Sequence, residues 1–150
     1  MIVYRITRKK YATDLSGSGA AVYGGRWNKK GTPVLYTGGN IEIALLETIV
    51  HIPTMLVPEL VLLTLEFPDH SITEIKISEL PKNWVNYPAP TVLSEIAQKW
   101  VDKNETIALK VPSCIIHSSC NYILNCSHPD FNLLRLVNHE EFHFDTRLKK

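Results

Sequence analysis

The chain has 150 residues, 45% of them hydrophobic and 21% charged, and its formal net charge is only +1. This length and composition are typical of one soluble globular domain with a core of its own. Because the net charge is so small, no global field draws the chain toward nucleic acid or an anionic membrane, and we expect it to bind neither directly. Any anion site must therefore be local.

Three features of the sequence favour the cytoplasm. The chain begins with a strand-like stretch rather than the hydrophobic region of a signal peptide. Its longest apolar runs, at 43–52 and 60–67, are too short and too interrupted to span a bilayer. The three cysteines are odd in number, which argues against a complete set of disulfides and suits a reducing compartment. We therefore expect a single cytoplasmic domain, 1–150.

Hydrophobic periodicity predicts an α+β domain with about two helices among roughly six to eight short strands. Residues 14–25, DLSGSGAAVYGG, are rich in Gly and Ser and are expected to form a loop. One helix spans 41–52, and a second follows Pro90. The predicted strands are 1–6, 33–37, 59–67, 71–77, 106–111, 114–117, 121–124 and 133–137.

The first helix carries a carboxylate where an apolar residue is expected. Asn40 is placed to cap this helix, and Glu42 lies in its first turn. Glu47, in contrast, shares a face with Ile43, and the opposite flank is also apolar, which is typical of a buried helix. Because burying an unpaired carboxylate costs several kcal/mol, Glu47 must be paired, hydrogen-bonded or protonated.

Two interpretations of Glu47 follow from this position. In the structural one, the carboxylate caps a loop or pairs with a core arginine. In the functional one, it lies at the floor of a pocket and stabilises positive charge that develops on a substrate. Arg26 suits either interpretation as the partner, and the helix alone does not distinguish them.

The segment HEEFH, 139–143, satisfies the H-E-x-x-H pattern of zinc peptidases. That chemistry needs both histidines on one helical face and a third ligand. Only seven residues follow His143, and the alternation of EEFHFD favours a strand. The three cysteines are spaced six residues apart and lack the paired spacing of zinc ligands. A zinc metallopeptidase is therefore a remote alternative, and we expect no metal site.

Residues 110–131, KVPSCIIHSSCNYILNCSHPDF, place polar side chains near the ends of predicted strands. Ser, Asn and His in such positions suit turns, and they also suit the lining of a pocket. Ser113 lacks the flanking glycines of a nucleophile elbow. We therefore expect Ser113 to form hydrogen bonds rather than to act as a nucleophile.

Seven stretches of the sequence form an ordered set from about Arg5 to Leu148: GGRWNKKGTPVLYT, IALLETIVH, LPKNW, LKVPS, NYILN, HPDF and FDTRL. In order and spacing this set resembles one family, the RES-domain toxins of bacterial toxin–antitoxin pairs. Two residues depart from the family pattern and concern local geometry only: Cys126 stands where the family usually has proline, and Ala97 where it usually has glycine.

The resemblance implies an ADP-ribosyltransferase-like fold, with two packed, mostly antiparallel sheets and flanking helices around an NAD cleft. It implies an enzyme that cleaves the nicotinamide–ribose bond of NAD by phosphorolysis or hydrolysis, or alternatively one that ADP-ribosylates a protein. NAD is then a substrate and not a prosthetic group, and phosphorolysis adds inorganic phosphate as co-substrate. The implied partner is a helix-turn-helix (Xre-like) antitoxin that blocks the cleft, and a homodimer within a larger assembly is a further expectation.

The resemblance also assigns site residues. Of these, Arg26, Tyr36 and Glu47 are expected to act in catalysis, and all except Glu47 are expected to contact NAD. The full set, matched by position, is Arg26, Trp27, Tyr36, Glu47, Ser113 and Asn121.

The chemistry of these residue types fits a dinucleotide. A planar guanidinium suits a pyrophosphate, and Gly24 and Gly25 allow a close approach of the backbone to the ligand. Trp27 or Tyr36 offers a face for a flat base, although core packing is the alternative for Trp27. Glu47 either stabilises charge on the ribose or binds its hydroxyls.

Overall fold

The computed structural model describes residues 1–53, 55 and 59–149. Its helices are α1 (Ser18–Tyr23), α2 (Ile41–Ile49) and α3 (Thr91–Lys103), and short 3-10 turns occur at Lys9–Tyr11, Ile77–Glu79, Phe131–Leu133 and Thr146–Leu148. Its strands are β1 (Ile2–Arg8), β2 (Val34–Gly38), β3 (Leu60–Glu66), β4 (Ile72–Glu74), β5 (Ala108–Pro112), β6 (Cys120–Asn125) and β7 (Arg135–Phe142). The predicted α+β class is therefore confirmed.

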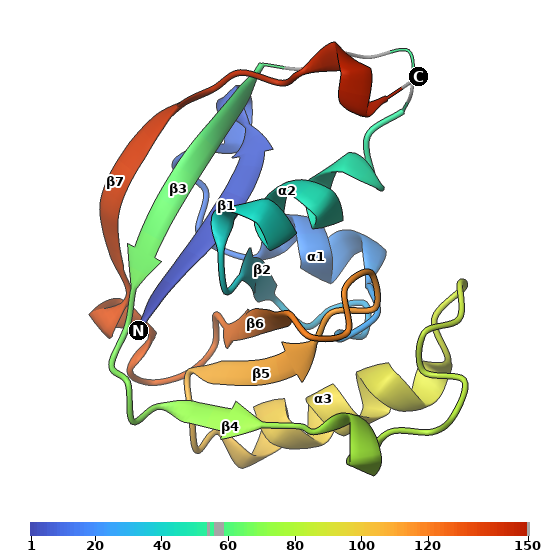
Figure 1. Cartoon of the computed structure of the whole chain (residues 1–150). Coiled ribbons are helices and arrows are strands. Elements are labelled where there is room, and N and C mark those ends of the chain that lie inside the picture. Colours follow the sequence, from blue (N-terminus) through green and yellow to red (C-terminus); the bar gives the residue numbers. More distant parts are fainter. Residues whose placement is uncertain (54, 56–58, 150) are drawn as a thin grey trace.

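The described strands form one sheet in the order β4-β5-β6-β2-β1-β3-β7, so the expectation of two packed sheets is not confirmed. All neighbours are antiparallel except β4 and β5. The sheet is nevertheless almost divided at its middle, because β1 and β2 pair only at Tyr4 and Gly38. Figure 1 shows the two arms, β1-β3-β7 and β2-β6-β5-β4, diverging from this point.

Helix α2 packs where the two arms meet, in contact with β1, β2 and β6. Its start is as predicted, because the Asn40 side chain accepts a hydrogen bond from the Ile43 amide at 2.7 Å. Its end comes earlier than predicted, at Ile49. Residues 51 and 52 donate to the carbonyls of Thr48 and Ile49 instead, which tightens the last turn.

The Gly/Ser-rich stretch 14–25 is not a continuous loop, since it contains helix α1. Asp14 accepts hydrogen bonds from Ser16 and Ser18, which fixes the chain ahead of this helix. Gly24 ends the helix with a φ of 68°, a left-handed conformation that glycine adopts without strain. The Gly/Ser-rich composition predicted a loop, whereas local hydrogen bonds order this segment.

Two further strand predictions need correction. Residues 114–117 form a bend and turn rather than a strand, because the Ser113 and Ser119 backbones already close a compact loop. The strand predicted at 71–77 shortens to β4. The remaining predicted strands are present within a few residues of their expected bounds.

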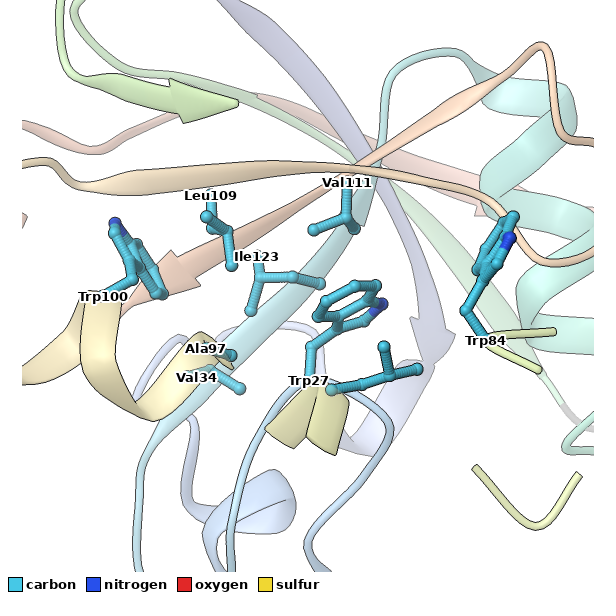
Figure 2. Packing of buried hydrophobic residues seen from close by; sticks show 9 residues of the cluster. Trp27, Val34, Trp84, Ala97, Trp100, Leu109, Val111 and Ile123 are labelled. Carbon is cyan, nitrogen blue, oxygen red and sulfur yellow. The ribbon is translucent and has the colours of Figure 1, made fainter. Parts of the chain in front are cut away.

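The main core lies between the β2-β6-β5 part of the sheet and α3. Figure 2 shows the Trp27 indole in the middle of this cluster and Trp84 at one side of it. The cluster consists of Trp27, Val34, Trp84, Leu93, Ala97, Trp100, Leu109, Val111 and Ile123. In the described part of the chain, no helix combines the length and apolar character that a bilayer crossing requires.

Gly38 lies in close contact with α2. A Cβ at this residue would lie 2.8 Å from the Ala44 amide nitrogen and 2.8 Å from Ile43 Cγ2. We predict that Gly38→Ala lowers the free energy of unfolding by about 1–3 kcal/mol, because α2 must move to accommodate the methyl group. Urea unfolding measures the change. Gly19→Ala is the control, since nothing lies within 4 Å of its Cβ, and an equal loss in both variants would contradict the packing argument.

Candidate active site

The Glu47 carboxylate joins three elements that are distant in sequence. From α2, its Oε1 accepts a hydrogen bond from Ser113 Oγ at 2.9 Å and one from Asn121 Nδ2 at 2.7 Å. Ser113 follows β5 and Asn121 lies on β6. The structure therefore brings together three of the residues predicted from the family resemblance.

Ser113 is completely buried and has no free hydrogen-bonding capacity. Its hydroxyl donates to Glu47 and accepts from the amides of Ile115 and Ile116, at 3.1 and 3.3 Å. Its own amide donates to the Ser119 carbonyl. In this geometry the Ser113 hydroxyl orients the Glu47 carboxylate, and the contact of Ser113 with NAD stays a prediction.

Asn121 differs from Ser113 in keeping one free atom. Its side chain is about nine-tenths buried, with Nδ2 engaged by Glu47. Because a carboxylate only accepts hydrogen bonds, this contact fixes the orientation of the amide. The Oδ1 atom is left buried without a hydrogen-bond partner in the described structure. A buried acceptor without a partner is costly, and here it marks a place for a donor from a ligand or water.

Glu47 is less buried than its helix position predicts. Its side chain is half-buried, and only Ile43 and Ala44 of α2 are fully buried. The two hydrogen bonds are both to Oε1, and within the described residues Oε2 accepts none. The carboxylate thus has one oxygen fixed by the protein and one available to a ligand.

Arg26 is presented by a tight turn between Gly25 and Asn28, whose backbones pair with each other. Tyr36 Oη accepts a hydrogen bond from the Trp27 amide and donates to Asn28 Oδ1 at 2.6 Å. A Cβ on Gly25 would lie 2.6 Å from this hydroxyl, so the glycine is required by Tyr36 rather than by a ligand. Asn28, which supports the whole turn, is not among the site residues predicted from the sequence.

Asn28 is almost fully buried, and the two N–H groups of its side chain are shared among three carbonyls. Its Nδ2 lies within hydrogen-bond distance of the carbonyl oxygens of Ala20, Lys29 and Thr32. Asn is common in turns because its side chain bonds to nearby backbone groups. In the sequence, the turn-like pattern NKKG at 28–31 is the signal that indicates this role. Tyr36 therefore acts here mainly as a support for the turn, although its ring remains partly exposed.

Arg26 does not pair with Glu47, contrary to one of the sequence interpretations. Its Nη1 donates to the Trp84 carbonyl at 2.6 Å and its Nη2 to the Asn86 carbonyl at 3.1 Å. None of the ion pairs formed among the described residues includes Arg26. The guanidinium is half-buried and bound only by neutral acceptors.

Arg26 and Glu47 both influence the pKa of the Cys114 thiol. Burial raises the pKa of the Cys114 thiol, Arg26 lowers it, and Glu47 raises it. Burial likewise raises the pKa of Tyr36 well above its usual range, against smaller opposing effects of the Trp27 amide and Arg26. Both charges therefore act on the thiol next to Ser113, although their side chains are not bonded.

Trp27 is buried among the core residues. Its side chain is 3% exposed and lies in the core cluster of Figure 2. This burial favours the core-packing alternative for Trp27, and its contact with NAD stays a prediction. Trp84 is not among the predicted site residues, yet its carbonyl accepts a hydrogen bond from Arg26.

Two surface cavities of the described structure lie away from Arg26 and Glu47. One of about 460 Å³ is lined by Met1, Phe67 and Arg135, among others, and one of about 240 Å³ is lined by Lys110, His117 and Cys120, among others. Neither includes Arg26 or Glu47. Neither cavity therefore corresponds to the predicted NAD cleft.

The HEEFH segment does not form the helix that a zinc peptidase needs. His139 lies within the edge strand β7 and pairs with Leu63, and His143 follows the end of that strand. Over the described residues, no group of three or more His, Cys, Asp or Glu side chains is arranged to hold a metal. The peptidase alternative gains no support from this geometry.

Residues 2–145 match the family model described as RES domain. The chain belongs to the RES-domain family. This RES domain is 38% identical over 154 residues to "Toxin Res" of Photorhabdus laumondii subsp. laumondii, a match that covers 100% of this chain and 98% of the relative. It is 32% identical over 141 residues to "Prs ADP-ribosylating toxin" of Sphingobium sp., covering 91% of this chain and 88% of the relative.

The fold of the RES domain is also similar to a known structure. It matches a chain of the M. tuberculosis MbcT–MbcA toxin–antitoxin complex with a TM-score of 0.74, over 99% of this chain and 86% of that chain. Sequence identity in this match is 17%, so the likeness concerns the fold alone.

The raised pKa of Tyr36 predicts a loss of stability in alkali. The neutral phenol is favoured in the folded state, so its contribution is intact below about pH 10, the unfolded pKa, and is lost as pH rises toward the folded pKa. We predict that, above about pH 10, the free energy of unfolding of wild type falls by up to about 1.4 kcal/mol per pH unit more than that of Tyr36→Phe. Urea unfolding between about pH 9 and about pH 11 gives both slopes. Parallel slopes would assign the alkaline loss to other groups.

Proposed function

We propose that this chain is the toxin of a toxin–antitoxin pair and that it consumes NAD by cleaving the nicotinamide–ribose bond. The observation that carries the proposal is the Glu47 carboxylate, fixed through Oε1 by Ser113 and Asn121 and free at Oε2. The names of its relatives, "Toxin Res" and "Prs ADP-ribosylating toxin", support the same class of protein.

The proposed chemistry uses the free oxygen of Glu47. When the bond to nicotinamide breaks, its electron pair leaves with the base and an oxocarbenium-like charge develops on the ribose. A carboxylate held in a fixed orientation stabilises that charge without reorganising. Water or phosphate then bonds to the same carbon and loses a proton, which completes hydrolysis or phosphorolysis.

Two further groups suit other parts of the dinucleotide. The buried Oδ1 of Asn121 accepts a hydrogen bond from a ribose hydroxyl or from the carboxamide of nicotinamide. Arg26 offers its guanidinium to the pyrophosphate, whose oxygens are stronger acceptors than the carbonyls that it binds here. Tyr36 contributes by holding the turn that presents Arg26.

A second candidate function is transfer of ADP-ribose to a protein. It differs only in the acceptor, a protein side chain in place of water or phosphate, and the name of the Sphingobium relative favours it. We further propose that an Xre-like helix-turn-helix antitoxin covers the site in the cytoplasm, and that the toxin assembles as a homodimer within that complex. The toxin–antitoxin complex of similar fold supports a partner of the antitoxin class.

Incubation of the purified protein with NAD, with and without inorganic phosphate, tests the proposal, with products identified by mass. We predict that Glu47→Gln lowers the rate of NAD loss at least about 100-fold, because the charge that stabilises the ribose is removed. Ser113→Ala should lower it less, through loss of orientation. Glu42→Gln, an exposed change in the first turn of α2, is the control. Full activity of folded Glu47→Gln would remove this residue from the mechanism.

Expression in bacteria without an antitoxin gives a second test. We predict that wild type arrests growth and depletes cellular NAD, whereas Glu47→Gln does neither. NAD is quantified in extracts taken as growth slows. Growth arrest at an unchanged NAD level would favour protein ADP-ribosylation, which intact-mass analysis of modified proteins detects.

A further inference from the structure

Arg26 clamps the segment Trp84–Asn86 through main-chain atoms. The two carbonyls that it binds, at 2.6 and 3.1 Å, belong to residues on either side of Val85. The Trp84 indole is buried in the core cluster, whereas Asn86 is exposed. The segment therefore has an anchored end and an exposed end, and Arg26 holds both.

Trp84 also contacts the loop that holds Glu47. Its indole lies against the imidazole of His117, with ring centroids 5.2 Å apart and planes tilted by 51°. His117 lies in the loop 113–119, which is closed by hydrogen bonds from Ser113 to Ser119 and from Ser119 to Ile116. The loop begins at the serine that donates to Glu47. A chain of contacts thus runs from Arg26 through Trp84 and His117 to Glu47.

We propose that Trp84 is a positioning residue that couples the binding of a phosphate-class anion at Arg26 to the loop that orients Glu47. The guanidinium is bound only by neutral carbonyls, and phosphate oxygens form charge-assisted hydrogen bonds that are roughly twice as strong. An anion that binds Arg26 uses N–H groups that these carbonyls leave free, and it also competes for the two that now hold Trp84 and Asn86. The freed segment shifts the Trp84 ring, and His117 passes the shift to the loop.

This coupling deepens the proposed function, because it makes the orientation of Glu47 depend on whether the phosphate end of a dinucleotide is bound. Its own test does not require turnover. Inorganic pyrophosphate serves as the probe, since it carries the anion without the ribose or the base. Hydrogen–deuterium exchange of peptides covering 81–90 and 113–119 reports on the two segments separately.

With saturating pyrophosphate, we expect exchange in wild type to become about fivefold faster at 81–90, the factor that corresponds to one lost hydrogen bond of about 1 kcal/mol. Exchange at 113–119 should change as well. In His117→Ala, an exposed substitution, the change at 81–90 should persist and the change at 113–119 should disappear. In Arg26→Gln both changes should disappear. His139→Ala, on the exposed strand β7, is the matched control and should behave as wild type.

Three results would overturn the coupling: no pyrophosphate binding to wild type, binding without a change at 81–90, or an undiminished change at 113–119 in His117→Ala. NAD loss measured on the same samples separates the two ideas. Exchange that follows the expected pattern in a protein that leaves NAD intact would support the coupling and refute the proposed function. If NAD is cleaved, the coupling predicts that His117→Ala lowers kcat about fivefold while pyrophosphate affinity is unchanged, on the same one-bond scale.

Discussion

The two hydrogen bonds to Glu47 Oε1 are the interaction on which the site depends. They tie α2 to the loop after β5 and to β6, and they do so at the point where the sheet is nearly divided. Each donor is itself constrained, since Ser113 accepts two main-chain amides and Asn121 is fixed in its strand. The half-buried carboxylate is oriented by uncharged donors rather than by a cation, which leaves its second oxygen available.

Arg26 is organised by a different principle. Its turn is built on uncharged hydrogen bonds from Tyr36 and Asn28, and its guanidinium is bound by uncharged carbonyls. An arginine that is positioned without a carboxylate retains its full charge for an anion. The cation and the carboxylate therefore remain unpaired. Trp84 accepts a hydrogen bond from Arg26 through its carbonyl and packs its ring against His117, in the loop that begins at Ser113.

Local patterns in the sequence predicted much of the fold. The Asn40 cap, the helix that follows it and most strands depend on residues close in the chain, and they form as expected. The predictions that failed depend on contacts between distant residues or on hydrogen bonds between residues only a few positions apart. Residues 14–25 are ordered by Asp14 and contain α1, residues 114–117 are held as a loop, and the single pair at Gly38 joins two arms into one sheet.

The sequence by itself determined which residues need hydrogen-bond partners from elsewhere in the chain. Glu47 is a carboxylate in a largely apolar helix, and Arg26 is a charged residue next to two glycines. The tertiary structure alone decided what those partners are. Packing buried Trp27 in the core and used Ser113 and Tyr36 as supports, whereas Trp84 came within reach of Arg26 from 58 positions away in the chain. Periodicity encodes which face of an element is buried, but it carries no record of which distant element covers that face.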